Sequence, residues 1–379
     1  MRRLLLLASA VVFVDTAFYA AITPLLPHYV ETLHISKSAA GLLSAAYPAG
    51  TFLGSLPGGY LAARFGVRQT TLLGLAIMSA SSVAFAFGTS VEMLDAARFV
   101  QGVGGAMTWA GAFGWLIGEA PAERRGELIG SAMGAAIVGA LFGPVLGAAA
   151  DLAGPEPVFC SVGATGVALM VWAFNTPGRA PTTPPRVATL VEAVRDPEVV
   201  RGIWLMTLPG LMFGTLNVLA PLRMDALGAG AVAIAGCFLV AAGFEAMVTP
   251  VIGRVSDRRG RLAPARAGLA GGFVIMLLLP WPTSAWELGA LIVLAAPVIG
   301  ILWAPAIAII ADGAERHGIE QAIGFSLVNV AWAVGQTAGS AGSARIADHT
   351  SDKVPYLLLA SVCAITLSVL RNRAVRVAR

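Results

Sequence analysis

The chain has 379 residues, of which 57% are hydrophobic and 12% are charged, and its formal net charge is +4. Soluble domains carry about 25% charged residues, so this composition excludes a soluble enzyme, a disordered protein and a disulfide-rich scaffold. The arginines do not form a contiguous basic patch on a soluble element, which excludes a nucleic-acid-binding surface. With a mean hydropathy of +0.79, the sequence predicts an all-α, polytopic membrane protein.

Twelve transmembrane helices are predicted in chain order. The first begins at Leu4 and continues to Pro27. These roughly 24 residues can cross a hydrocarbon core of about 30 Å and are too many for the apolar part of a signal peptide. Arginine clusters and runs of glycine, proline and aspartate separate the other spans. The approximate centres of the spans are Thr16, Gly50, Ser79, Gly105, Val138, Ala164, Gly210, Ala242, Phe273, Val298, Ala331 and Ser361.

The longest polar stretch, residues 176–201, is rich in proline and is predicted to be a linker. It divides the chain into an N-terminal bundle of six helices, residues 1–175, and a C-terminal bundle of six helices, residues 202–379. Twenty of the 25 lysine and arginine residues fall on the same side of the membrane as the linker. The positive-inside rule therefore places the linker and both termini in the cytoplasm, in a multi-pass protein of the cell membrane.

The two halves repeat a short basic loop. Span two is followed by Gly59-Tyr-Leu-Ala-Ala63-Arg64-Phe-Gly66, and span eight is followed by Gly253-Arg-Val-Ser-Asp257-Arg258-Arg-Gly260. The two glycines and the arginine of the first loop recur 194 positions later, an offset close to half the chain length. Six-helix halves with equivalent basic loops are typical of transporters built from parallel repeats.

These loops resemble the Gly-x-x-x-Asp-Arg-x-Gly pattern of the major facilitator superfamily, and the resemblance covers essentially the whole chain. Three further segments resemble motifs of its twelve-span drug:proton antiporters, the group of tetracycline exporters and vesicular amine transporters. They are Pro24-Leu-Leu-Pro27 on span one, Leu94 to Gly104 on span four, and Gly139-Ala-Leu-Phe-Gly143-Pro144-Val-Leu-Gly147 on span five. The resemblance implies two pseudo-symmetric bundles, a cytoplasmic gate made by the two loops, and an antiporter motif at Gly139, Gly143, Pro144 and Gly147.

The first loop departs from the family pattern, because Ala63 stands where the second loop has Asp257. The resemblance then implies that the gate of the first half is weaker or is secured otherwise. On span five, and at Gly50, Gly54 and Gly58 of span two, small residues spaced by four let neighbouring helices approach closely. Such a face suits either ordinary packing or the rocking of one bundle against the other, and the sequence leaves both open.

Three ionisable residues are predicted inside the membrane, where a charge costs at least about 2.5–3.5 kcal/mol. Asp15 lies roughly 16 Å along span one, Glu245 lies roughly 12 Å from the end of span eight, and Arg98 lies on span four. We expect Asp15 to be the principal protonation site with Arg98 as its charge partner. Glu245 is expected to be a second protonation or cation-binding site. For both acids the alternative is a buried charge that only fixes helix packing.

A substrate cavity near these acids is predicted to have walls of amphipathic aromatic and amide side chains, which suit an amphiphilic cation. The candidates are Tyr19, Trp109, Asn217, Asn329, Trp332 and Gln336. For each aromatic residue, packing within the bundle is the alternative. The three cysteines lie far apart and the four histidines lack metal-ligand spacing, so no metal site is predicted.

The sequence favours a secondary transporter over an enzyme, because it contains no recognisable nucleophile–base set and no phosphate-binding loop. The leading hypothesis is export of an amphiphilic or cationic drug or metabolite in exchange for protons. Such a protein would need no cofactor besides the proton gradient, and we expect it to work as a monomer. The alternatives are transport of a sugar or another neutral metabolite by the same fold, and a receptor-like member that does not transport.

Overall fold

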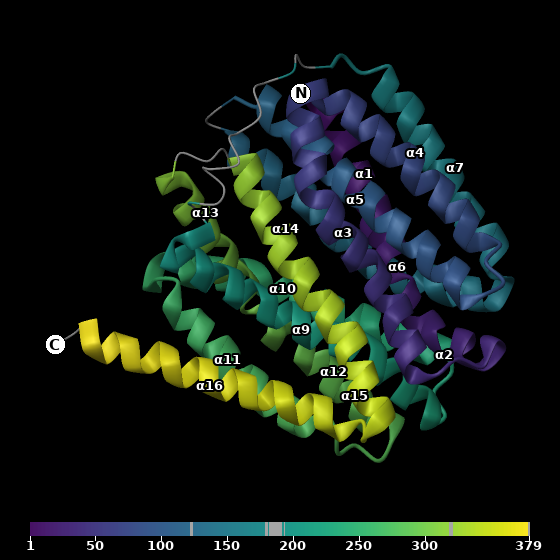
Figure 1. Cartoon of the computed structure of the whole chain (residues 1–379), viewed down its shortest axis with the longest axis vertical. Helices are drawn as coiled ribbons and strands as arrows, with labels where there is room; N and C mark the ends of the chain where they lie inside the picture. The colour runs from purple at the N-terminus through teal and green to yellow at the C-terminus, as the bar shows by residue number, and fades with distance from the viewer. Residues whose placement is uncertain (122–123, 179–180, 182–191, 193, 318–320, 378–379) are drawn as a thin grey trace.

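The computed structural model describes the chain except for residues 122–123, 179–180, 182–191, 193, 318–320 and 378–379. The described residues form helices joined by short turns, as the apolar spans predict (Figure 1). The N-terminal half contains α1 (Arg2–Ala20), α2 (Ile22–Leu33), α3 (Lys37–Phe65), α4 (Val67–Ala86), α5 (Val91–Glu119), α6 (Arg125–Ala153) and α7 (Pro155–Phe174). The C-terminal half contains α9 (Pro197–Ala226), α10 (Ala231–Arg259), α11 (Leu262–Leu278), α12 (Ala285–Gly300), α13 (Trp303–Arg316), α14 (Gln321–Thr337), the π-helical turn η2 (Ala338–Gly342), α15 (Ser343–His349) and α16 (Lys353–Val377).

These helices make up the twelve predicted spans. Span one consists of α1 and α2, span ten of α12 and α13, and span eleven of α14, η2 and α15, while each other span is one helix. Within the described residues, eight segments are long and apolar enough to cross a membrane by themselves. The helices α3 and α5 are not among them, because glycines, hydroxyl groups and charged residues make their sequences less apolar, and some of these polar side chains are buried between helices. Arg98 on α5, for example, is only 1% exposed.

The C-terminal half begins at a capped helix. The Asp196 carboxylate accepts a hydrogen bond from the backbone N–H of Glu198 and contacts His317 and Arg316 at 3.0 and 3.4 Å. These partners lower the pKa of Asp196 to about 2. Since α9 starts at Pro197, the last five residues of the predicted linker, 197–201, are helical. Most of the remaining linker lies outside the described residues.

The two bundles lie side by side, with α4 and α7 on one flank and α11 and α16 on the opposite flank (Figure 1). The glycines of span two pack against α5, where a Cβ atom on Gly54 would lie 3.0 Å from Ala106 and Val103. The glycines of span five pack against α1 and α2 in the same way, and a Cβ atom on Gly143 would lie 2.9 Å from the Ala17 carbonyl oxygen. In this conformation both glycine faces therefore serve close packing within the N-terminal bundle.

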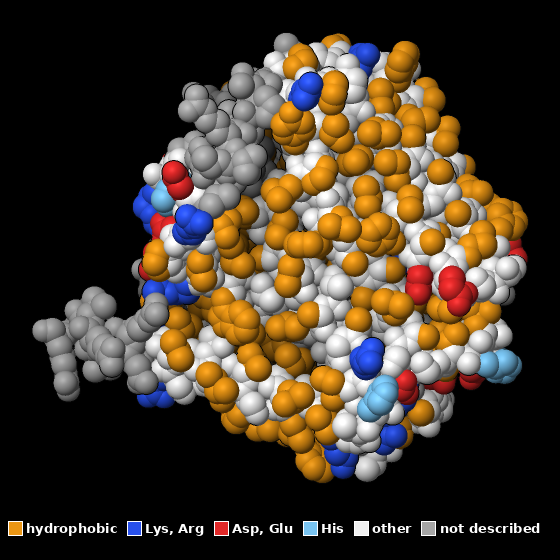
Figure 2. Space-filling view, in the orientation of Figure 1, with side chains coloured by type: hydrophobic (Ala, Val, Ile, Leu, Met, Phe, Trp, Pro, Cys, Tyr) orange, Lys and Arg blue, Asp and Glu red, His pale blue; other side chains and the backbone are white. Residues whose placement is uncertain are grey.

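The molecule has two charged ends separated by an apolar middle. Figure 2 shows hydrophobic side chains over the middle of the visible face and charged side chains toward its two ends. One end carries the arginines of the two repeated loops, including Arg64 and Arg258, and is termed the basic end. The other, the far end, carries the turns at residues 34–36, 87–90, 227–230 and 349–352.

The two bundles touch at the far end. Lys37, at the start of α3, forms an ion pair of 2.6 Å with Asp352, which precedes α16. The hydroxyl of Ser38 donates a hydrogen bond of 2.7 Å to Asp348 of α15. Because α3 belongs to one bundle and α15 and α16 belong to the other, these contacts join the bundles.

Toward the basic end, several glycines of α6 and α10 have open space in front of them. A Cβ atom built on Gly130 or Gly134 of α6, or on Gly253 of α10, would meet no described atom within 4 Å. On the other side of the interface a Cβ atom on Gly59 would lie 3.6 Å from Ser326 of α14. The described contacts thus join the bundles at the far end and, between α3 and α14, on this side of the interface as well.

Candidate functional site

Asp15 lies at the centre of the N-terminal bundle. Its side chain is fully buried, and Oδ2 accepts hydrogen bonds from the Tyr47 hydroxyl at 2.7 Å and the Trp109 indole N–H at 2.8 Å. The other oxygen, Oδ1, has no hydrogen-bond partner among the described atoms, and it packs against Gly105 of α5. A buried carboxyl with donors on only one oxygen is poorly compensated for a permanent charge. The geometry therefore suits a group that gains and loses a proton.

Arg98 lies on α5, the helix of Trp109, about two helical turns from Gly105, against which Asp15 packs. Its guanidinium donates to Gln101 at 2.8 Å and to the backbone carbonyls of Phe18 and Tyr19, next to the junction of α1 and α2. Its predicted role as the charge partner of Asp15 stays a prediction, and within the described residues it makes no ion pair with that carboxylate. The reason is the register of α5, since Arg98 is seven residues, or about 10 Å, from the level of Gly105. The ring of Tyr47 lies between them, with its centroid 5.3 Å from the guanidinium carbon.

Glu245 of α10 occupies a similar environment in the C-terminal bundle. Its Oε1 atom accepts a hydrogen bond of 2.8 Å from the Trp303 indole N–H. The Trp303 ring stacks on Phe213 of α9, with centroids 5.8 Å apart and an interplanar angle of 7°. Unlike Asp15, Glu245 is only partly buried, because it borders a cavity between the two bundles.

This central cavity has a volume of about 220 Å³ and is bounded by α1, α2, α6, α9, α10, α12, α13 and α14. Four of the six predicted substrate-binding residues border it, namely Tyr19, Asn217, Trp332 and Gln336. Phe213, Phe238 and Trp303 add further aromatic surface, and Glu245 is the one charged side chain among the residues described around it. The cavity combines one carboxylate, several aromatic rings and two amides.

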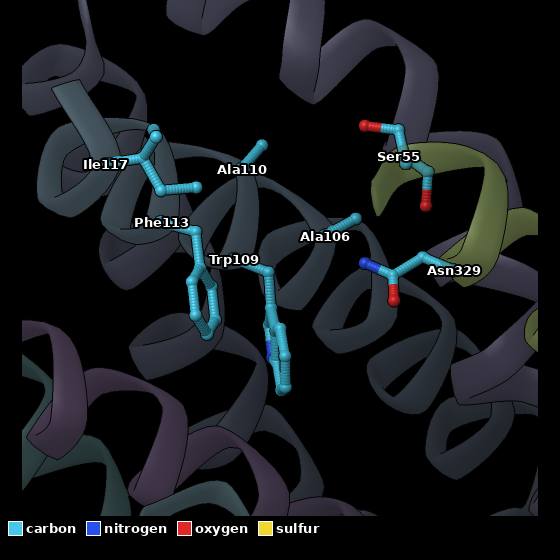
Figure 3. A pocket seen from close by; sticks show the side chains of 9 residues that line it. Ser55, Ala106, Trp109, Ala110, Phe113, Ile117 and Asn329 are labelled. Carbon is cyan, nitrogen blue, oxygen red and sulfur yellow. The ribbon is translucent and has the colours of Figure 1, made fainter. Parts of the chain in front are cut away.

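The other two predicted residues, Trp109 and Asn329, border a second pocket of about 20 Å³, which is room for about one water molecule. Figure 3 shows the Trp109 and Phe113 rings side by side on α5, with Asn329 reaching toward them from a different helix. The predicted substrate-binding set is therefore divided between a cavity large enough for a small organic molecule and a narrow pocket on the other face of Trp109.

Tyr19 connects the buried acid to the central cavity. Its ring centroid lies 4.8 Å from that of Tyr47, the residue that bonds Asp15. Its hydroxyl accepts a hydrogen bond of 2.6 Å from the Gln336 amide in the opposite bundle, and its ring meets Trp332 edge-on at 5.6 Å. A change in the protonation of Asp15 can thus alter the contact between the bundles through Tyr47 and Tyr19.

Two residues of this site, Tyr47 and Trp303, are missing from the sequence prediction. Trp303 lies 194 positions after Trp109, the same offset as the repeated loops, so the internal repeat contains the signal for it. Tyr47 has no comparable signal, because a single tyrosine in an apolar span is indistinguishable from packing.

The repeated loops have a clear conformational reason for their second glycine. Gly66 and Gly260 both have a positive φ, at 100° and 82°, which is favourable only for glycine. Arg64 donates a hydrogen bond to the Tyr60 hydroxyl at 2.9 Å. The side chain of Asp257 lies outside the described part of the chain, so its predicted role in the gate, like that of Ala63, stays a prediction.

The contribution of Asp348 to closure of the far end is expected to be independent of pH between about pH 5 and pH 8. Hydrogen bonds from Ser38 lower the pKa of Asp348 in the closed contact. Because the pKa is lowered, the contribution of Asp348 is fully present above its ordinary pKa and is lost only as the pH falls through the lowered value. In the double variant Asp15→Asn with Glu245→Gln, in which the two proposed coupling acids cannot titrate, the distance between spin labels at Thr32 and Thr350, measured by double electron–electron resonance, should stay constant over this range. A distance that grows on mild acidification would show that another group controls closure.

Comparison with known proteins agrees with this architecture. Residues 7–340 match the Major Facilitator Superfamily. The uncharacterized MFS-type transporter YcaD of Shigella flexneri is 25% identical over 376 residues, covering 98% of this chain and 96% of that protein. A POT family transporter crystallised with 5-aminolevulinic acid superposes with a TM-score of 0.77 at 14% identity, covering 99% and 96% of the two chains. A D-xylose–proton symporter superposes with a TM-score of 0.75 at 16% identity, covering 97% and 96%. The chain belongs to the Major Facilitator Superfamily of membrane transporters.

Proposed function

We propose that this protein is a proton-coupled antiporter that exports amphiphilic or cationic compounds by alternating access. The observation that supports this most directly is the central cavity, in which the carboxylate of Glu245 lies among the aromatic rings of Tyr19, Phe213, Trp303 and Trp332. A carboxylate attracts a cation, and aromatic faces add cation–π attraction in a desolvated site. No lysine or arginine is among the residues described around this cavity, so nothing there opposes a positive charge.

The proposed orientation of the protein in the membrane follows from the distribution of basic residues. The positive-inside rule assigns the basic end to the cytoplasm. The far end is joined by the Lys37–Asp352 and Ser38–Asp348 contacts, as expected of a state that is shut toward the outside. In the opposite state the loops at 59–68 and 253–261 would approach each other, closing the cytoplasmic side.

Coupling requires that the binding of substrate and the binding of protons exclude each other within one conformational cycle. Asp15 and Glu245 would each take up a proton when open to the outside and release it when open to the cytoplasm. Glu245 can exchange its proton directly for a cationic substrate in the cavity. Asp15 has no exposed surface, so its charge would act through Tyr47 and Tyr19 on the contact with Gln336.

Glu245→Gln should weaken the apparent affinity for cationic substrates by about 10-fold or more, because one charge-assisted contact is lost. Neutral substrates of similar size should be affected much less. Uptake of a panel of cationic and neutral dyes into inside-out vesicles, with an imposed proton gradient, measures both. Glu315→Gln, which removes an exposed acid from the last turn of α13, is the matched control.

The same panel tests the alternative of a neutral substrate. The amides of Asn217 and Gln336 and the hydroxyl of Tyr19 can bind the hydroxyl groups of a sugar-like molecule. If neutral polyols are transported and cations are not, and Glu245→Gln has no effect, export of cations is the wrong assignment.

A further inference from the structure

Asp15 and Glu245 are held in the same kind of site, one in each bundle. Each site is made by an indole N–H and a glycine that belong to one span. In the N-terminal site, Trp109 donates to Asp15 at 2.8 Å, and a Cβ atom on Gly105 would lie 2.7 Å from Oδ1. In the C-terminal site, Trp303 donates to Glu245 at 2.8 Å, and a Cβ atom on Gly300 would lie 2.8 Å from Oε1. Each arrangement is termed a carboxyl notch. Both notches have room for the carboxyl only because the second wall lacks a side chain.

Each indole is fixed in its orientation by a stacked phenylalanine. The Trp109 ring stacks on Phe113 with centroids 5.3 Å apart at 27°, and the Trp303 ring stacks on Phe213 at 5.8 Å and 7°. The phenylalanine comes from the same helix in the first notch and from α9 in the second. Stacking on one face leaves the N–H edge of each ring aimed at the carboxyl.

The tryptophans correspond to each other in the internal repeat, whereas the acids do not. Trp303 lies 194 positions after Trp109, the offset that also relates the two basic loops. The same offset relates Asp15 to Pro209, and Glu245 to Thr51. The acid reaches the notch from span one in the first half and from span eight in the second. The feature shared by the halves is therefore the notch.

We infer that Trp109 and Trp303 are corresponding positioning residues that hold the ionised forms of Asp15 and Glu245, so that each bundle carries its own proton-exchanging carboxyl. This inference rests on the proposed proton coupling. An indole N–H can donate a hydrogen bond and cannot accept one, so it never takes the carboxyl proton. Its bond to a charged carboxylate is about twice as strong as its bond to a neutral carboxyl. Each tryptophan therefore favours release of the proton and aligns the oxygen that receives it.

The surroundings of the notches differ in a way that divides the two roles. Asp15 bonds the Tyr47 hydroxyl, and the Arg98 guanidinium lies over the ring of the same tyrosine. The described side chain that bonds Glu245 is Trp303, and the titratable group that shares its cavity is Tyr19. The Glu245 notch borders the central cavity, so substrate can displace its proton. The Asp15 notch is sealed from the cavity, and only the far face of Trp109 meets the small pocket. The second notch is the one in which substrate and proton compete.

The test is a pH titration of the carboxyl C=O stretching bands by difference infrared spectroscopy, on the full-length protein in lipid bilayers. Bands are assigned by their loss in Asp15→Asn and in Glu245→Gln. Trp109→Phe should move the midpoint of the Asp15 band to higher pH by about one unit, and Trp303→Phe should do the same for the Glu245 band only. Trp286→Phe, at a side chain 91% exposed at the far end, is the control and should move neither band.

A second pair of variants separates the hydrogen bond from the shape of the ring. Replacing either tryptophan by benzothienylalanine keeps the fused ring and removes the N–H donor. It should shift the matching band as much as phenylalanine does, even if the phenylalanine variant folds poorly. Unmoved midpoints, or a shift that affects both bands equally, would overturn the inference.

This readout separates failure of the inference from failure of the proposed function. If the bands titrate and shift as expected but no substrate-dependent proton movement occurs, the positioning role stands and antiport is wrong. If neither acid titrates between about pH 5 and pH 9, both proposals fail together.

Discussion

Asp15→Asn should reduce proton-driven transport by about 100-fold or more, the scale expected when a proton-transferring group is removed. Asparagine has the shape of aspartate and can keep its oxygen within reach of Tyr47 and Trp109, which bond Oδ2 in the native protein. It cannot take up or release a proton. Substrate uptake into inside-out vesicles under an imposed pH gradient measures the loss, and the amount of folded protein in the membrane should be unchanged.

The size of this effect distinguishes coupling from structure. If Asp15 served only to fix helix packing, the neutral isostere would satisfy the same donors without the cost of a buried charge, and transport would persist. Exchange of labelled for unlabelled substrate, which moves no net proton, should survive in Asp15→Asn. Glu92→Gln, at an exposed acid near the start of α5, is the matched control. Full proton-driven transport by Asp15→Asn would show that the coupling site lies elsewhere.

Much of the fold follows from composition and periodicity. Apolar length and arginine placement predict twelve spans, and the structure has them because a bilayer requires each crossing to satisfy its backbone hydrogen bonds internally. Apolar length and arginine placement do not predict where the helices break within spans one, ten and eleven. Pro24 and Pro27 mark the first break, but η2 contains only alanine, glycine and serine, so its π-helical turn arises from packing against α3 and α9.

The candidate site is predicted in part. Scarcity of charge identifies Asp15, Arg98 and Glu245, since each lies in an apolar run. Helical spacing cannot say which neighbour each one faces, because that depends on how the helices are rotated about their axes. Arg98 therefore faces backbone carbonyls at the junction of α1 and α2 instead of Asp15. For the same reason, Trp109 bonds the acid while lying away from the cavity that Tyr19 and Trp332 border.

The contacts that close the far end are individually weak. They are a half-exposed ion pair between Lys37 and Asp352, worth up to about 1 kcal/mol, and hydrogen bonds such as that of Ser38 with Asp348, each worth about 0.5–1.5 kcal/mol. A few kilocalories per mole is small enough for substrate or proton binding to reverse. Deeper in the interface, the hydroxyl oxygens of Ser44 and Ser340 lie 3.4 Å apart, across the boundary between the bundles.

A disulfide between cysteines at positions 44 and 340 should bring transport to background and should do so reversibly. The double variant Ser44→Cys with Ser340→Cys is made in a chain whose native cysteines, Cys160, Cys237 and Cys363, are replaced by alanine. Oxidation locks α3 to span eleven and holds the far end shut, so substrate bound from the basic end cannot leave on the other side. Reduction with dithiothreitol should restore the transport rate measured before oxidation.

The control is a disulfide that joins helices of one bundle. A Cβ atom on Gly272 of α11 would lie 3.6 Å from the sulfur of Cys363 on α16, so Gly272→Cys with the native Cys363 can pair within the C-terminal bundle. Rigid-body movement of whole bundles predicts that this internal bond leaves transport intact, whereas the bond across the interface stops it. If the oxidised pair at 44 and 340, shown to be linked by mass spectrometry, still transports at the reduced rate, then the far end does not open during the cycle. Substrate would have to leave by another route, and alternating access between these two bundles would be the wrong mechanism.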